Sequence, residues 1–249
     1  MYHPIGVDIK KDFSIVQITS VKDFLKANYS KMNKLIENAI RVCDFMIDPS
    51  SPNIPKSLLS NCAGVAIFHS VEAGAIISAS VANGILLRRD QESGEWSPPS
   101  ALCMADVGVG GVLGAEKSDI IMVMVGDDVV HEMSAMAQLK LGLNLSIVAG
   151  PLTKKGEGYD REAAFHLSPR GTGVTYCYAH SAGTFIAHEV TAGVLLERGY
   201  VNAEFYNSAA KPIDILFKKG SVEIPEESRV PELHKKLEMI VKGESSVPQ

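Results

Sequence analysis

An internal repeat constrains the fold of this chain more than any other feature of its sequence. Residues 64–89 and 173–198 align without a gap at a constant offset of 109, and ten of the 26 aligned positions are identical. The glycines of both copies are ten residues apart; they are Gly64, Gly74 and Gly84, then Gly173, Gly183 and Gly193. Because neither copy could easily bury its apolar residues alone, the repeat predicts one intertwined domain that uses the same unit twice.

The composition of the repeated unit predicts β-structure. Short runs of β-branched residues are bounded by Gly, Asn and Ser, and a ten-residue spacing accommodates one strand of about five or six residues and one turn. Asn83-Gly84 between two apolar runs is typical of a tight hairpin turn, and Glu92-Ser93-Gly94 marks a further turn. We therefore expect each copy to be a small antiparallel meander.

A membrane-spanning helix is the alternative interpretation of the first copy. Its uncharged stretch, Ala73–Leu87, has only 15 residues, whereas a spanning helix needs about 20. Three polar residues, Ser78, Ser80 and Asn83, interrupt it. The sequence therefore favours strands over a membrane span.

Charge and cysteine content exclude several classes of function. The 249-residue chain has a net charge of −5, so it lacks the positive field with which proteins attract nucleic acids. Its four cysteines form no CxxC pair, which argues against a zinc site and for reduced thiols in a cytosolic protein. The first residues lack the apolar core of a secretion signal, so we expect a cytoplasmic location.

Residues 21–47 are predicted to form an amphipathic helix, which Pro49, Pro52 and Pro55 then end. Residues 9–41 hold seven basic and three acidic side chains, a local charge of +4 in an acidic protein. The common interpretation is a helix that packs on the core with a solvated outer face. The functional interpretation is contact with an anionic membrane, or with acidic actin, and the apolar face could insert among lipid headgroups if the helix detached.

The remaining patterns complete an α+β prediction with an internally duplicated, mostly antiparallel β core that is barrel-like or sandwiched, and with N- and C-terminal helices packed on it. Strands are expected at 120–125 and 139–150, a polar loop at 153–161, and helices at 129–137, at 211–219 and from Pro231. The expected organisation is an N-terminal arm with the start of the basic helix (1–29), a single domain (30–242) and a frayed tail (243–249).

Catalytic and cofactor motifs are weakly represented. Gly108, Gly110 and Gly114 resemble a dinucleotide loop, but their spacing is GxGxxxG and a strand follows, so close packing in a sheet explains them better. Residues 150–156, GPLTKKG, do not match a P-loop. No histidine or cysteine spacing suits a metal, and no nucleophile motif occurs. The sequence predicts a non-enzymatic protein without cofactor or metal.

An ordered series of motifs resembles the SYLF domain family over roughly residues 30–242. The quoted motifs are Ile54-Pro55, Leu58-Leu59, Gly64-Val65-Ala66-Ile67, Ala73-Gly74, Gly84, Trp96-Ser97-Pro98-Pro99-Ser100-Ala101, Gly108-Val109-Gly110-Gly111, Gly114-Ala115-Glu116, Leu141-Gly142, Ala149-Gly150-Pro151, Tyr178, Gly183-Thr184-Phe185, Gly193-Val194-Leu195 and Phe205-Tyr206.

The resemblance implies a non-enzymatic module that binds phosphoinositide-containing membranes in membrane traffic or endocytosis, peripherally and from the cytoplasm. An actin-binding cytoskeletal adaptor is the alternative that the same resemblance implies. Ala182 departs from the family's Ser-Lys-Gly pattern and counts against a ligand contact there. The candidate lipid-binding residues are the lysines of the basic segment and of the loop after Gly150-Pro151: Lys10, Lys11, Lys22, Lys26, Lys31, Lys34, Lys154 and Lys155.

Overall fold

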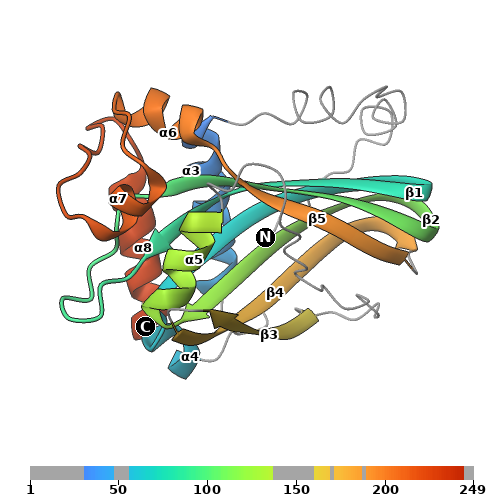
Figure 1. The fold of residues 1–249 in the computed structure, drawn as a ribbon, viewed down its shortest axis with the longest axis horizontal. Coiled ribbons are helices and arrows are strands. Elements are labelled where there is room, and N and C mark those ends of the chain that lie inside the picture. The colour runs from blue at the N-terminus through green and yellow to red at the C-terminus, as the bar shows by residue number, and fades with distance from the viewer. Residues whose placement is uncertain (1–30, 48–55, 137–159, 169–170, 187–188, 244–249) are drawn as a thin grey trace.

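In the computed structural model, residues 31–47, 56–136, 160–168, 171–186 and 189–243 are described. They form an α+β fold in which helices gather at one end of a long antiparallel sheet (Figure 1). The helices are α3 (Met32–Ile47), α4 (Lys56–Ser60), α5 (Asp127–Met136), α6 (Gly199–Tyr206), α7 (Pro212–Phe217) and α8 (Val230–Lys242). The strands are β1 (Gly64–Arg88), β2 (Ser100–Val125), β3 (Asp160–Ser168), β4 (Gly171–Ile186) and β5 (Glu189–Glu197).

The two repeat copies occupy equivalent places on either side of β2. The first copy is β1, and the second is β4 together with β5; all three strands pair antiparallel with β2. The registers put equivalent residues of the two copies on the same face of the sheet. Leu86 and its counterpart Leu195, for example, both belong to one buried cluster. The duplication predicted from the sequence is therefore present in the structure.

The predicted meander within each copy is wrong. β1 is one strand of 25 residues, and Asn83 and Gly84 lie inside it, paired with Cys103 and Leu102. Gly84 is required by close packing and makes no turn there. A Cβ atom at this position would lie 2.3 Å from the carbonyl oxygen of Ile67. The predicted turn at residues 92–94 is confirmed, with Gly94 at a φ of 73°.

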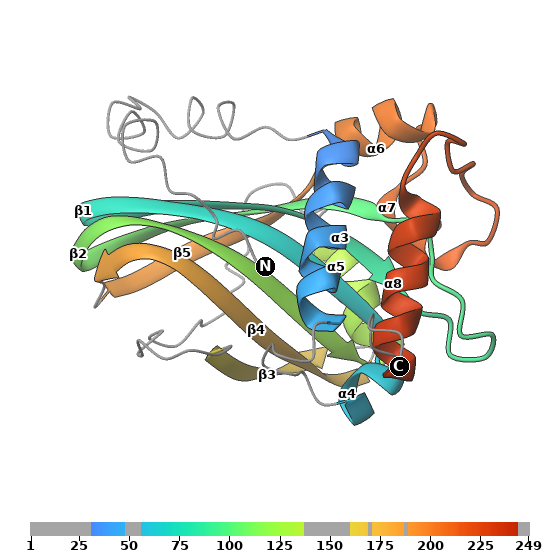
Figure 2. The same ribbon diagram turned by 180° about the vertical axis from the view of Figure 1, so that it is seen from behind.

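The long strands fold over at a tip that lies away from the helices (Figures 1 and 2). The register of β1 shifts between Ala75 and Ile77, where three β2 residues, 110–112, stand opposite one. Such a bulge bends a strand and increases its twist. This bend brings the two ends of β1 together. The residues that flank the strand are hydrogen-bonded there, since the Arg89 N–H donates to the Ala63 carbonyl oxygen at 2.7 Å. The folded sheet is not closed into a barrel, so of the two predicted shapes the sandwiched one describes it better.

Alternate residues of β1 and β2 define an inner and an outer face of the folded sheet. Even-numbered residues form the inner cluster, where Phe68, Leu86 and Met124 pack with Val130 of α5 and Leu216 of α7. Odd-numbered residues form the outer face, which packs under α3 and α8 at the helical end of the molecule. This alternation is the ordinary two-residue period of a strand.

Several expected elements are confirmed. Helices α5, α7 and α8 lie where the sequence predicts them, and Leu233, Leu237 and Ile240 of α8 are buried. The glycine-rich residues 108–114 lie inside β2, which confirms a strand in that stretch, while their close packing stays a prediction. Asp160 and Arg161 begin β3 where a loop was expected. The expected strand at 139–150 and helical residues 21–30 lie outside the described residues, and the domain boundaries stay predictions.

Candidate functional site

Two of the eight candidate lysines, Lys31 and Lys34, lie within the described residues, at the start of α3. Their side chains are 71% and 57% exposed. Lys31 Nζ lies 2.9 Å from Glu204 Oε1 of α6, and Lys34 Nζ lies 2.8 Å from Glu37 Oε2. The other six lie outside the described residues; they are Lys10, Lys11, Lys22, Lys26, Lys154 and Lys155.

These exposed ion pairs moderate the basic character of the candidate site without blocking it. The Lys34 ammonium group lowers the pKa of the Glu37 carboxyl through their hydrogen bond. Exposed pairs of this kind contribute only about 0–1 kcal/mol, so a stronger anion can displace the carboxylate at little cost. Lys236 of α8, whose side chain is partly buried, pairs with Asp44 near the other end of α3. The described part of the basic face is thus mixed in charge.

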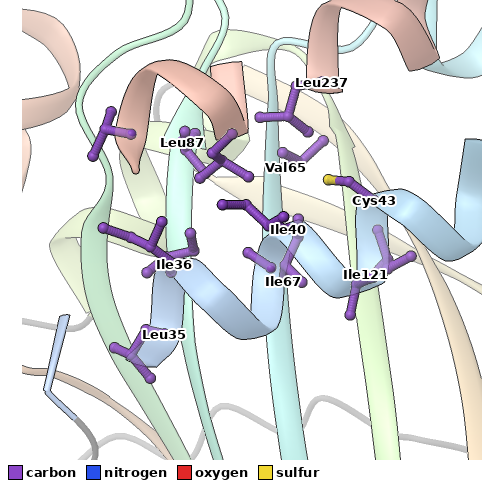
Figure 3. Close-up of a cluster of buried hydrophobic side chains, with 14 of the residues drawn as sticks. Leu35, Ile36, Ile40, Cys43, Val65, Ile67, Leu87, Ile121 and Leu237 are labelled. Carbon is purple, nitrogen blue, oxygen red and sulfur yellow. The ribbon is translucent and has the colours of Figure 1, made fainter. Parts of the chain in front are cut away.

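The apolar face of α3 belongs to the core of the protein. Leu35, Ile36, Ile40 and Cys43 project toward Val65, Ile67, Leu87 and Ile121 of the sheet and Leu237 of α8 (Figure 3). Eight of its side chains are buried, and full burial of each Leu, Ile, Val or Met side chain among them contributes about 1.5–3 kcal/mol to stability. Within Met32–Ile47 the structure therefore supports the core-packing interpretation, because detaching this helix would disrupt the core.

A buried carboxylate fastens α3 to the sheet. The two terminal guanidinium nitrogens of Arg41 donate to Asp119 of β2 at 3.0 Å, and His69 Nδ1 of β1 lies 2.8 Å from Asp119 Oδ1. The Asp119 side chain is only 6% exposed, whereas Arg41 reaches solvent. Sequence reasoning missed this cluster. Its only local signal is an acid directly before the apolar run that begins at Ile120.

The tryptophan motif that carries part of the family resemblance has a structural role here. Ser97 Oγ accepts the Arg88 backbone N–H at 2.9 Å and donates to the Pro98 carbonyl oxygen at 3.0 Å. The Tyr206 hydroxyl of α6 donates to the Pro99 carbonyl oxygen at 2.6 Å. Asn202 of α6 joins the same region by accepting the Ala101 N–H and donating to Ser100 Oγ. The motif therefore docks α6 against the sheet.

A second ion cluster joins the end of β1 to the start of α5. Arg88 donates to both carboxylate oxygens of Asp127, at 2.9 and 2.7 Å, and to Asp90 at 3.2 Å. Its guanidinium carbon also lies 4.7 Å from the centre of the Phe217 ring. The hydrogen bonds from Arg88 to these acids raise its pKa, and Asp127 contributes most. These ion pairs link the end of β1 to the start of α5.

Two of the described thiols, those of Cys43 and Cys62, are poorly reactive. Burial raises the pKa of Cys43 to about 12 and that of Cys62 to about 11. Since the thiolate is the reactive form of cysteine, both groups stay protonated and inert near neutral pH. Among the described residues, no three His, Cys, Asp or Glu side chains are grouped so as to hold a metal ion. The same part of the chain contains no helix long and apolar enough to cross a bilayer.

Comparison with known families identifies the protein at the family level. The family model described as "Ysc84: Las17-binding protein actin regulator" matches residues 105–240, more than half of the chain. The chain belongs to the Ysc84 family. This match confirms the resemblance to the SYLF domain, and the description of the Ysc84 family is that of a regulator. No solved structure matches the chain.

Known members of the Ysc84 family are longer than the region they share with this chain. Protein YSC84 of Saccharomyces cerevisiae is 33% identical over 172 residues, which cover 69% of this chain and 35% of that protein. LAS seventeen-binding protein 3 of the same species is 35% identical over 162 residues, which cover 64% and 34%. The human SH3 domain-containing YSC84-like protein 1 is 31% identical over 164 residues, which cover 66% and 46%. The chain thus spans between a third and a half of these relatives.

A histidine of α8 is expected to make the stability of this Ysc84-family chain sensitive to pH. Burial lowers the pKa of His234 below its usual value, and His234 Nε2 lies 3.0 Å from the Ser97 carbonyl oxygen. Because the unfolded chain binds the proton more readily, stability falls as the pH drops below about 6.5. We expect His234→Gln to flatten this fall in urea titrations at a series of pH values. An unchanged slope would contradict the assignment.

Proposed function

We propose that this chain is a non-enzymatic module that binds anionic, phosphoinositide-containing membranes through its N-terminal basic segment. The observation that carries the proposal is the position of Lys31 and Lys34. They are exposed at the start of α3, where the chain arrives from the segment that holds Lys22 and Lys26. The core-packed helix thus provides a rigid base from which a basic segment continues.

The physical argument for this surface is electrostatic. Each lysine close to an anionic membrane contributes about 1 kcal/mol, so four to six lysines are enough for reversible association. Salt screens such contacts, so we expect binding to weaken as ionic strength rises. The apolar face of α3 stays in the core, and the helix contributes to binding through its exposed lysines. Lys154 and Lys155 are candidate additional contacts.

Charge reversal of four lysines tests the proposal. Replacing Lys22, Lys26, Lys31 and Lys34 by glutamate is expected to weaken binding by about 4 kcal/mol or more, roughly a thousandfold. Flotation with phosphatidylcholine vesicles, with and without a phosphatidylinositol bisphosphate, measures the change. Thermal unfolding shows whether the variant is folded.

A matched control separates the proposed site from an effect of net charge. Four exposed lysines in the C-terminal region, Lys211, Lys218, Lys219 and Lys235, can be reversed with the same change in total charge. We expect this control to float almost as well as the unmodified chain. Equal losses in both variants would show that the N-terminal lysines are not the site.

Regulation of actin is the second candidate, and the description of the matched family favours it. An acidic filament could use the same lysines. Co-sedimentation with actin filaments at physiological salt distinguishes the two candidates, because a nonspecific basic contact is released as salt screens it. Sedimentation that persists at this salt, together with absent flotation, would favour the actin function over the membrane function.

A further inference from the structure

One side of α3 carries a stripe of mainly basic and polar residues, which we call the basic stripe. Its members are three and four residues apart, as neighbours on one side of a helix are; they are Lys31, Lys34, Asn38, Arg41 and Phe45. The first two are exposed and the other three are partly exposed. Figure 2 shows α3 between α8 and the part of the sheet that leads to the tip. Because Arg41 bonds to Asp119 of β2, the basic stripe ends where helix and sheet meet.

The meeting point of α3 and the sheet, which we call the corner, consists of Arg41 of α3, His69 of β1, and Lys117 and Asp119 of β2. The register pairs His69 with Asp119 and Val71 with Lys117, so the three strand residues of the corner share the outer face. Lys117 is thereby a diagonal neighbour of His69, at a distance of roughly 7–8 Å that a long side chain can span. Among the outer positions of residues 65–71 and 117–123, Asp119 is the only acid.

Positive charge exceeds negative charge in the corner. Arg41 and Lys117 are cations near neutral pH and Asp119 supplies one negative charge, so one positive charge is in excess, and protonation of His69 adds a second. The Arg41 and His69 side chains are 37% and 23% exposed, whereas that of Asp119 is buried. An anion in solution can therefore reach the cations of the corner while the carboxylate is shielded from it.

Asp119 orients Arg41 and His69 without using all of their hydrogen-bond donors. A guanidinium group has five N–H donors, and Asp119 accepts from the two terminal nitrogens of Arg41. It bonds to His69 through Nδ1, so Nε2 is a second donor in the charged form of the ring. Donors that are already held in place bind a ligand without the entropy cost of ordering flexible side chains. The corner thus resembles a prepared anion site more than a set of mobile surface lysines.

We propose that the corner binds a phosphate monoester, with the phosphorylated headgroup of an inositol lipid as its source. Guanidinium and ammonium groups both favour phosphate, to which they donate charge-assisted hydrogen bonds. This inference rests on the proposed membrane function, because the basic stripe continues the N-terminal basic segment and turns this side of α3 toward the bilayer. The basic segment then supplies attraction to any anionic surface, and the corner supplies a site for one headgroup.

Titration of the full chain with inositol 1,4,5-trisphosphate, a soluble headgroup, tests the proposal. The chain has seven histidines, and His69→Gln identifies the ring signal of His69 in nitrogen-15 spectra. We expect that signal to shift as the headgroup is added, while the signal of His131, whose ring contacts Phe217, stays in place. Inorganic phosphate at equal concentration is the second arm. Tighter binding of the inositol phosphate assigns the corner to a lipid headgroup, and equal affinity assigns it to free phosphate.

Lys117→Ala is expected to weaken binding of the inositol phosphate about fivefold in calorimetry, which is the effect of one lysine close to an anionic group. Lys235→Ala, at an exposed position of α8, is the matched control and should change the affinity less than twofold. Thermal unfolding shows whether both variants are folded. His69→Gln is the second variant, because glutamine can still bond to Asp119 and bears no charge.

The outcomes separate the corner from the membrane function itself. Suppose that the chain floats with vesicles, but the His69 signal does not shift and Lys117→Ala binds the inositol phosphate as tightly as Lys235→Ala. The corner is then overturned and the membrane function stands. A chain that binds the inositol phosphate at His69 without floating supports the corner and overturns the membrane function. If the chain neither floats nor binds the inositol phosphate, both are overturned.

Discussion

Gly84→Ala is expected to destabilise the protein by about 3 kcal/mol or more, because no side chain fits between the two halves of β1. A Cβ atom there would lie 2.3 Å from the Ile67 carbonyl oxygen and 2.5 Å from a ring carbon of Phe68. The nearest obstacle is backbone, so relief requires the folded strand to open. Urea unfolding of the purified chain measures the loss.

Gly199→Ala is the matched control for this substitution. A Cβ atom at Gly199 would meet the Glu197 carboxylate at 3.3 Å, and that side chain can rotate away. We expect a change in unfolding free energy within about 0.5 kcal/mol, as for most surface substitutions. A Gly84→Ala variant as stable as this control would show that the halves of β1 do not approach each other as described.

Asp119→Ala is expected to cost about 3 kcal/mol, because it removes the buried carboxylate that joins Arg41 and His69. The partial exposure of Arg41 limits the loss, since its guanidinium group can turn to water. The variant should also loosen α3, which faster hydrogen exchange of its amide groups would report. Urea unfolding gives the free energy.

Glu37→Ala is the corresponding control on the surface of α3. It removes an ion pair with Lys34 in which both side chains are more than half exposed, so the expected change is below about 1 kcal/mol. If Asp119→Ala were no more destabilising than this control, the buried cluster would not fasten α3 to the sheet.

Structural features that depend on local sequence patterns agree with the predictions. The helical period around Leu233 and Leu237 specifies the buried side of α8, and the apolar run ending at Gly126 specifies the end of β2. The repeat predicted a duplicated β core, and both copies flank β2 in the structure. These features depend on residues close in sequence, or on similarity between two segments, and both are visible without coordinates.

The glycine spacing was misinterpreted for a physical reason. A glycine permits a positive φ in a turn, and it also permits close approach of two backbones, and sequence alone does not distinguish the two uses. Gly84 serves the second use and Gly94 the first. The prediction of a hairpin at Asn83-Gly84 applied the turn rule where packing was the cause.

For the candidate site, the sequence predicts the basic charge of the surface but not all of the contacts that its lysines make. The excess of lysine before α3 is a property of composition, and the exposure of Lys31 and Lys34 agrees with it. Their acidic partners were only partly predictable. Glu37 is one helical turn from Lys34, whereas Glu204 is 173 residues from Lys31 and reaches it only through the docking of α6.

The α+β class, the duplication, the main helices and the basic character of the N-terminal segment can all be predicted from the sequence, because each follows from local period, repetition or composition. The tertiary structure alone shows that β1 is one long strand folded at a tip, that the second copy divides into β4 and β5, and that Arg41, His69 and Asp119 meet. These outcomes depend on strand register between distant segments. A shift of one residue would exchange the inner and outer faces, and no local pattern specifies that register.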